Sequence, residues 1–310
     1  MKTGLGNDEA LKAYIKDARR RRLTERTIEN YRSCVKIFFQ FLNGNAVDVD
    51  IDGLRRFLDH LVDILNLADA SLSRYFSALA SFYEFLEFEG VVDKSLIPLF
   101  RKRYLRHLEG TNNSQSERQI IGVEQMAALI NSILDPRDKA VVILLAKTGI
   151  RRNELVSIDI VDIKWEENAI MLKPTRKRTN RHMFFDDETA RVLKRWMIAR
   201  ESRVQDSDSK ALFLNQEGRR LKRNGIYSLV TKHAERVGIH NPHSKDLSRR
   251  FTPHCCRHWF TTHLIRSGMS REMVKELRGD VRMEAIDLYN HIDRKELRMA
   301  YLAHIPQLGV

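Results

Sequence analysis

The sequence predicts a mainly α-helical protein with a small antiparallel β-sheet, an α+β fold divided into two domains. Three observations support this prediction. Apolar residues recur at helical spacing through the first hundred residues, short strand-like stretches follow only in the second half, and a polar run, GTNNS, lies between the two parts. The chain of 310 residues is long enough for two separate hydrophobic cores.

The N-terminal domain, predicted over residues 1–108, is expected to be a bundle of four helices. Apolar stripes place three of them at residues 9–22, 51–65 and 70–88, and another runs from a capping Thr24 to about Gly44. The expected core consists of Phe38, Phe41, Leu58, Leu61, Phe76, Leu79, Phe82 and Phe85.

A basic and then polar segment, RKRYLRHLEGTNNSQSER, follows this bundle. Its Gly-Thr-Asn-Asn-Ser run cannot form a core, so residues 109–118 are predicted to be a linker. Arg101 and Arg103 belong to a cationic cluster that can follow a phosphate backbone. A solvated helix end is the alternative interpretation for each of them.

The second domain, predicted over residues 119–292, mixes helices and strands. A further helix in the tail, residues 293–310, begins after the capping residue Asp293 and packs either on its own domain or on a neighbouring protomer. The other expected helices cover residues 122–134, 136–147, 187–201, 223–237, 253–267, 270–278 and 283–290, and the expected strands cover 161–165, 169–173 and 182–185.

Composition narrows the classes of function. The 54 Lys and Arg residues outnumber the 41 Asp and Glu residues, and the net charge of +13 favours a polyanionic partner. Because the basic residues are spread over both halves, nucleic acid is preferred to a membrane surface. No apolar run approaches the ~18 residues that span a bilayer, and the start lacks the apolar core of a signal peptide, so we expect a cytoplasmic protein. Its three cysteines also fit a reducing compartment.

The first candidate site motif is TGIRRNEL, residues 148–155. Gly149 ends the preceding helix, and Arg151 lies three residues before Glu154. On a helical turn this spacing lets the carboxylate hold the guanidinium in an orientation that binds a planar anion. An ordinary surface salt bridge is the alternative.

The second motif is KPTRKRTNR, a basic loop between two predicted strands. A hairpin tip of this kind can enter a groove of nucleic acid, and a lysine there can protonate a leaving oxygen. Nonspecific attraction to the phosphate backbone is the alternative for most of its side chains. Those able to contact phosphate are Lys173, Arg176, Lys177, Arg178, Asn180 and Arg181.

The third motif runs from Thr252 to Tyr289 and begins with a helix on which His254 and Arg257 share one face. A zinc site is rejected, because adjacent cysteines on a helix point about 100° apart and the sequence has no CxxC pair. Cys256 is expected to pack as a small hydrophobic residue.

Tyr289 on its own would be a core residue of an amphipathic helix. A free phenol, with an ordinary pKa of about 10, is a poor nucleophile unless its anion is stabilised. Arg151, Arg257 and Lys177 are the residues that could supply that stabilisation.

Taken together, the motifs resemble those of the tyrosine recombinase (phage integrase, Xer-like) family. The TGIR run with Glu154 resembles its first arginine motif, and HCCRH at residues 254–258 resembles its HxxR motif. Gly279 and Asp280, followed nine residues later by Tyr289, resemble its Gly-His…Tyr motif with the histidine replaced. The helical bundle is similar to the core-binding domain of the family, so the resemblance covers nearly the whole chain.

The resemblance implies a mechanism. Arg151 and Arg257 would clamp the scissile phosphate, and Tyr289 would attack it to form a 3′-phosphotyrosine. His254 would accept a proton or donate a hydrogen bond, and Lys177 would protonate the leaving 5′-oxygen, with Lys173 as the other candidate. The reaction would need no metal, ATP or other cofactor and no small-molecule ligand. Its substrate would be double-stranded DNA, bound by a homo-tetramer on paired sites.

Asp280 is the departure from the family pattern. An ionised carboxylate can only accept hydrogen bonds and would repel a phosphate, so we expect Asp280 to accept from Arg257 or His254 and fix its geometry. An N-cap of the helix that carries Tyr289 is the alternative. The substitution, together with the ending IDLYNHIDRKELRMAYLAHIP, resembles an archaeal or archaeal-viral branch.

Two other functions share parts of this pattern. A type IB topoisomerase-like enzyme would use the same chemistry, but the predicted helical bundle and the short chain argue against it. A DNA-binding relative with altered catalysis would explain Asp280, but the presence of Arg151, His254, Arg257 and Tyr289 favours an active enzyme.

Overall fold

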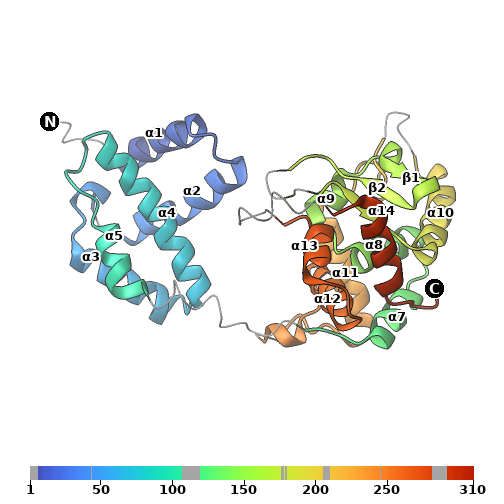
Figure 1. Cartoon of the computed structure of the whole chain (residues 1–310). Coiled ribbons are helices and arrows are strands. Elements are labelled where there is room, and N and C mark those ends of the chain that lie inside the picture. Colours follow the sequence, from blue (N-terminus) through green and yellow to red (C-terminus); the bar gives the residue numbers. More distant parts are fainter. Residues whose placement is uncertain are drawn as a thin grey trace. The chain divides into compact units, whose positions relative to one another are not determined.

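The computed structural model describes residues 6–42, 44–106, 119–175, 178, 180–204, 210–244, 246–280 and 292–310. The chain forms two compact units, Met1–Gln115 and Ser116–Val310, each with its own hydrophobic core (Figure 1). The predicted fold class, mainly helical with a small antiparallel sheet, is confirmed. No helix in the described part of the chain has both the length and the apolar composition needed to cross a membrane.

The N-terminal unit is a helical bundle. Thr24 caps its second helix by accepting a hydrogen bond from the Thr27 N–H at 3.2 Å, as predicted. The helices are α1 (Asn7–Arg20), α2 (Glu25–Phe41), α3 (Ile51–Asp59), α4 (Asp69–Phe88) and α5 (Ile97–Phe100), with the short 3₁₀ or π turns η1 (Ala46–Asp48), η2 (His60–Ile64) and η3 (Arg101–Leu105).

Aromatic side chains fill much of this core. Phe38 and Phe57 pack edge to face with ring centroids 4.8 Å apart, and Phe76 stacks on Phe100 at 5.2 Å. Two helical segments that were not predicted, α5 and η3, bury Phe100 and Leu105 in the bundle. The basic run that starts at residue 101 is therefore helical through residue 106. Of the predicted core residues, Phe41 and Leu58 are only partly buried.

The C-terminal unit combines helices with one sheet. The predicted helix over residues 283–290 lies outside the described residues. The α-helices are α7 (Val123–Asn131), α8 (Pro136–Thr148), α9 (Arg152–Ser157), α10 (Asp187–Glu201), α11 (Arg223–Arg236), α12 (Pro253–Arg266), α13 (Arg271–Arg278) and α14 (Arg294–His304). The strands are β1 (Ile163–Lys164), β2 (Ala169–Met171) and β3 (His182–Phe184), and the 3₁₀ turns are η4 (Ile160–Asp162), η5 (Trp165–Glu167) and η6 (Leu247–Arg249).

The sheet has the strand order β1-β2-β3 and is antiparallel throughout, as predicted. Ile170 of β2 lies opposite Ile163 of β1 and Met183 of β3. The first strand is shorter than predicted because η4 and η5 occupy the residues on both sides of it. The connection from β2 to β3 carries the basic loop of residues 173–181.

Helix α8 lies in the core of the C-terminal unit, and its end positions the TGIR motif. Every residue from Ala140 to Thr148 is buried, and α8 contacts α7, α10, α11 and α12 (Figure 1). Gly149 ends the helix with a φ of +59°, and a methyl group there would lie 2.5 Å from the Phe260 ring. The chain therefore turns sharply between α8 and α9, packed against Phe260 of α12 and two residues before Arg151.

The tail helix α14 packs on its own unit. Asp293 caps it by accepting hydrogen bonds from two backbone N–H groups of its first turn, as predicted. Leu297 and Tyr301 are buried, and the Tyr301 hydroxyl donates to the carbonyl of Lys147 at 3.0 Å. This is the intramolecular arrangement, and docking of the tail on a neighbouring protomer stays a prediction.

A buried ion cluster joins α8 to the segment that follows α14. The fully buried Lys147 Nζ donates to Asp186 Oδ2 at 2.6 Å, to Glu188 Oε2 at 2.7 Å and to the carbonyl of Pro306 at 2.5 Å. Glu188 also accepts from the backbone N–H groups of residues 308–310 at 2.6 to 3.3 Å. Burial raises the pKa of Glu188, but the hydrogen bond from Lys147 and these N–H groups outweigh it, so the pKa lies below its ordinary value.

Candidate active site

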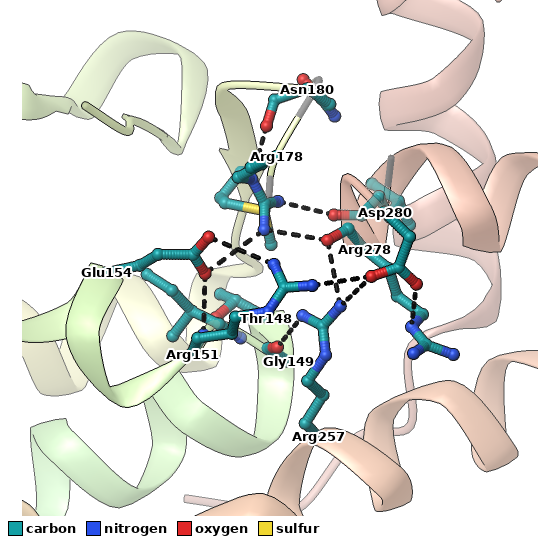
Figure 2. Close-up of polar contacts among 12 residues, drawn as sticks. Thr148, Gly149, Arg151, Glu154, Arg178, Asn180, Arg257, Arg278 and Asp280 are labelled. Atoms are coloured by element: carbon teal, nitrogen blue, oxygen red, sulfur yellow. Dashed lines mark hydrogen bonds and ion pairs between the residues drawn. The ribbon is translucent and has the colours of Figure 1, made fainter. Parts of the chain in front are cut away.

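Arg151 is held by Glu154, as the spacing predicts (Figure 2). The Arg151 backbone N–H donates to Glu154 Oε2 at 2.8 Å, and its Nη1 lies 3.3 Å from Oε1. Glu154 is only 4% exposed, so this pair is not an ordinary surface salt bridge. The buried carboxylate fixes both the backbone and the guanidinium of Arg151 at the start of α9.

Arg257 extends from α12 into the same region. Its Nη1 donates to the carbonyl of Gly149 at 2.6 Å, and its Nη2 donates to the carbonyl of Arg278 at 3.1 Å. Burial and, after it, the positive charge of Arg151 lower the pKa of Arg257 to about 10. Since this value is still well above neutral pH, Arg257 remains a cation at the base of the site.

Asp280 joins the two arginines. Its Oδ1 accepts from Arg151 Nη2 at 2.7 Å and from Arg257 Nη2 at 2.9 Å, while its Oδ2 lies 2.9 Å from Arg278 Nε (Figure 2). The prediction that Asp280 accepts from Arg257 is therefore confirmed. The alternative, an N-cap of the next helix, concerns residues outside the described part of the chain. The shared Oδ1 marks a point where two guanidinium groups converge on one oxygen.

A pocket of about 450 Å³ opens beside this cluster. Arg151, Arg257 and His254 line it, and so do Arg152 and Arg223, two residues that were not predicted to belong to the site. His254 is exposed in the first turn of α12, unlike the buried Arg257. Arg152 could have been predicted from the sequence, because it directly follows Arg151 in the IRRN run. Arg223, at the start of α11, belongs to no motif that would have indicated it.

The charges around the pocket favour an anion. A cluster of ion pairs beside the pocket contains four guanidinium groups and the carboxylates of Glu154 and Asp280. Its formal charge is therefore +2. Three of these groups are buried, where screening by water and salt is weak. The four arginines are Arg151, Arg178, Arg257 and Arg278.

Comparison with known protein families shows which family this chain belongs to. Residues 121–296 match the phage integrase family, and residues 11–88 match the N-terminal SAM-like domain of phage integrases. The first match covers more than half of the chain. This protein belongs to the phage integrase family.

Curated relatives of this integrase-family protein span nearly its whole length. Tyrosine recombinase XerC of Roseiflexus castenholzii is 28% identical over 296 residues, which are 93% of this chain and 90% of the relative. Tyrosine recombinase XerD of Oceanobacillus iheyensis is 26% identical over 302 residues, which are 93% and 94%. The integrase-family protein is thus a site-specific tyrosine recombinase.

Solved structures share the fold of this recombinase. The Tn1549 transposon integrase in complex with transposon right end DNA aligns with a TM-score of 0.67 at 17% identity, over 94% of this chain and 97% of that one. XerH site-specific recombinase bound to palindromic difH substrate aligns with a TM-score of 0.65 at 21% identity, over 88% and 78%.

The basic loop of the recombinase requires one correction. The prediction that Arg178 contacts phosphate is wrong, because its side chain is fully buried and bound by protein carbonyls. Lys173 and Arg181 are exposed, but Lys173 Nζ is paired with Asp159 Oδ2 at 2.6 Å. Arg176 and Lys177 lie outside the described residues.

The other predicted site residues are Tyr289 and two arginines of the N-terminal unit. Tyr289 lies outside the described residues. Arg103 is exposed, and Arg101 is partly buried. Cys255 and Cys256 lie on the buried face of α12, and burial raises the pKa of the Cys256 thiol well above its ordinary range. Cys256 therefore packs as a small hydrophobic residue, as predicted.

Proposed function

We propose that this recombinase cleaves and rejoins the strands of double-stranded DNA through a 3′-phosphotyrosine formed by Tyr289. The observation that carries the proposal is the convergence of Arg151 and Arg257 on the single oxygen Asp280 Oδ1. Two converging guanidinium groups can bind the non-bridging oxygens of a phosphodiester and stabilise the charge of its pentacoordinate transition state.

The reaction proceeds by transfer of the phosphoryl group. The Tyr289 hydroxyl oxygen forms a bond to phosphorus as the bond to the 5′-oxygen breaks, and Lys177 gives that oxygen a proton, with Lys173 as the other candidate. His254, which lines the pocket, accepts the tyrosine proton or donates to the phosphate. The 5′-hydroxyl of another strand then attacks the phosphotyrosine and releases Tyr289. The phosphotyrosine conserves the bond energy, so the reaction uses neither ATP nor a metal.

Asp280 serves this chemistry by fixing the two arginines in the absence of a phosphate. Each of its hydrogen bonds to a guanidinium is charge-assisted and directional. We also propose, on this residue and the C-terminal sequence, that the protein represents an archaeal or archaeal-viral branch of the family.

DNA contacts outside the pocket come from both units. In the N-terminal unit, Arg101 lines a second cationic pocket of about 580 Å³ together with Lys102 and Arg106, and Arg103 lies between them in the sequence. In the C-terminal unit, Arg176 and the exposed Arg181 and Lys173 come from the basic loop. Two integrase-fold neighbours, the Tn1549 integrase and XerH, are solved with DNA, which supports a DNA partner here.

We further propose that the protein acts in the cytoplasm as a homo-tetramer on two paired sites. Exchange between two duplexes breaks four strands in all. Each break consumes one tyrosine nucleophile, so four protomers supply the required set.

A covalent-adduct experiment tests the proposed function. The protein is incubated with nicked duplex DNA carrying its site, which traps the cleaved strand, and the products are separated under denaturing conditions. We expect a protein–DNA adduct that is absent in Tyr289→Phe. An adduct of equal yield in Tyr289→Phe, or none with the native protein on any site it binds specifically, would refute the proposal. Recombination between two plasmids that carry the site then separates a recombinase from a relaxing enzyme.

A further inference from the structure

Arg178 is a buried cation that the proposed chemistry leaves without a role. Its guanidinium donates to the carbonyls of Leu277 at 2.7 Å and Arg278 at 3.0 Å, and its Nε donates to the carbonyl of Asn180 (Figure 2). These groups belong to the basic loop itself and to the C-terminal end of α13. The side chain thus ties the loop to α13 and has no surface left for DNA.

The backbone at Gly279 is shaped around this side chain. Gly279 has a φ of +59°, and a methyl group there would lie 2.5 Å from Arg178 Cγ and 2.9 Å from its Nε. Burial lowers the pKa of Arg178, and the carboxylate of Glu154 and the carbonyls at the negative end of α13 offset part of that cost. A buried charge enclosed in this way is fixed in one position.

Arg178 shares one partner with each phosphate-binding arginine. Glu154, which holds Arg151, also lies 3.4 Å from Arg178 Nη1. The carbonyl of Arg278, which accepts from Arg257 Nη2 at 3.1 Å, also accepts from Arg178 Nη1 at 3.0 Å. A shift of Arg178 therefore displaces the supports of Arg151 and Arg257 together.

We propose that Arg178 is a positioning residue for strand cleavage, which fixes the spacing of Arg151 and Arg257 and anchors the loop that carries Lys177. This inference rests on the proposed function. It assigns to Arg178 a role in the rate of the chemical step and none in DNA affinity. Misplacing catalytic groups by about 1 Å can reduce a rate by about 100-fold.

The experiment compares Arg178→Met with a matched buried arginine, Arg200. Arg200, in the last turn of α10, is also buried and donates twice to one backbone carbonyl, that of Ala211, at 2.8 and 3.0 Å. We expect Arg178→Met to bind site DNA with native affinity and to form the Tyr289 adduct about 100-fold more slowly at saturating DNA. Arg200→Met should keep the native rate at temperatures where it is folded.

The outcomes separate this inference from the proposed function. A native cleavage rate in folded Arg178→Met overturns it, and so does a loss confined to DNA affinity with an unchanged rate at saturation. If Arg178→Met does not fold, Arg178→Lys keeps the charge with fewer planar donors. A folded Arg178→Lys must then cleave more slowly than the native protein, and a native rate overturns the inference. If the native protein forms no Tyr289-dependent adduct, the proposed function itself fails.

Discussion

Removing the buried amine of Lys147 should destabilise the C-terminal unit strongly. In Lys147→Met the chain keeps a side chain of similar length, but Asp186 and Glu188 lose the cation that lies 2.6 and 2.7 Å from them. Both carboxylates are less than a tenth exposed, so water cannot replace the lost partner without a structural change.

The size of the effect follows from what the carboxylates retain. Removing one partner of a buried ion pair costs about 3 to 5 kcal/mol. Asp186 keeps its hydrogen bonds from the Thr189 N–H and hydroxyl, and Glu188 keeps those from residues 308–310. We therefore expect the lower end, about 3 kcal/mol, which lowers the Tm of a unit of this size by about 6 to 12 °C.

Thermal unfolding followed by circular dichroism and calorimetry measures this change. The exposed Lys210→Met is the control and should change the Tm by about 1 °C or less. The double variant Lys147→Met with Glu188→Gln should recover part of the loss, because one uncompensated charge is removed. A Tm of Lys147→Met equal to that of Lys210→Met would refute the assigned role of this ion cluster.

Three further predictions concern the site and its supports. Gly149→Ala should lower the free energy of unfolding by about 3 kcal/mol, because its φ is positive and the added methyl meets Phe260; Gly238→Ala, with a φ of +76° and open space, should lose only about 1 kcal/mol. Asp280→His should retain strand cleavage, measured as the rate of adduct formation, because histidine can donate to the phosphate directly. Finally, Glu188 stabilises the fold above its unfolded pKa, about 4.5, so stability should fall as the pH drops below that value, and less steeply in Glu188→Gln.

Each of these has a contrary outcome. Equal losses in the two glycine variants would show that the aromatic contact at residue 149 costs nothing. Complete loss of cleavage in Asp280→His would show that the carboxylate cannot be exchanged for the family residue. Identical acid unfolding curves for the native protein and Glu188→Gln, measured by fluorescence, would contradict the lowered pKa of that carboxyl.

Local spacing allowed part of the site to be predicted. The pairing of Arg151 with Glu154 and the caps Thr24 and Asp293 depend on residues within one helical turn, so the sequence alone indicates them. The contact of Asp280 with Arg257 was predictable only through the resemblance to a family, since 23 residues separate them.

Burial within the basic loop was not predictable from the sequence. Arg178 and Arg181 have the same chemistry and similar neighbours, yet one is enclosed by α13 and the other is exposed. Loop side chains have no periodicity that assigns them to a face, and the outcome depends on a helix about a hundred residues later. Lys147 was also missed as an interior cation, because its partners lie on α10 and beyond α14.

The burial of the cysteines makes α12 a natural reporter of local opening. Cys34, Cys255 and Cys256 are all buried, so thiol reagents can modify the native protein only when its structure opens. Two of these thiols lie on the helix that carries His254 and Arg257. The rate at which they react, with and without DNA, would therefore measure how often that helix separates from the core, without any introduced label.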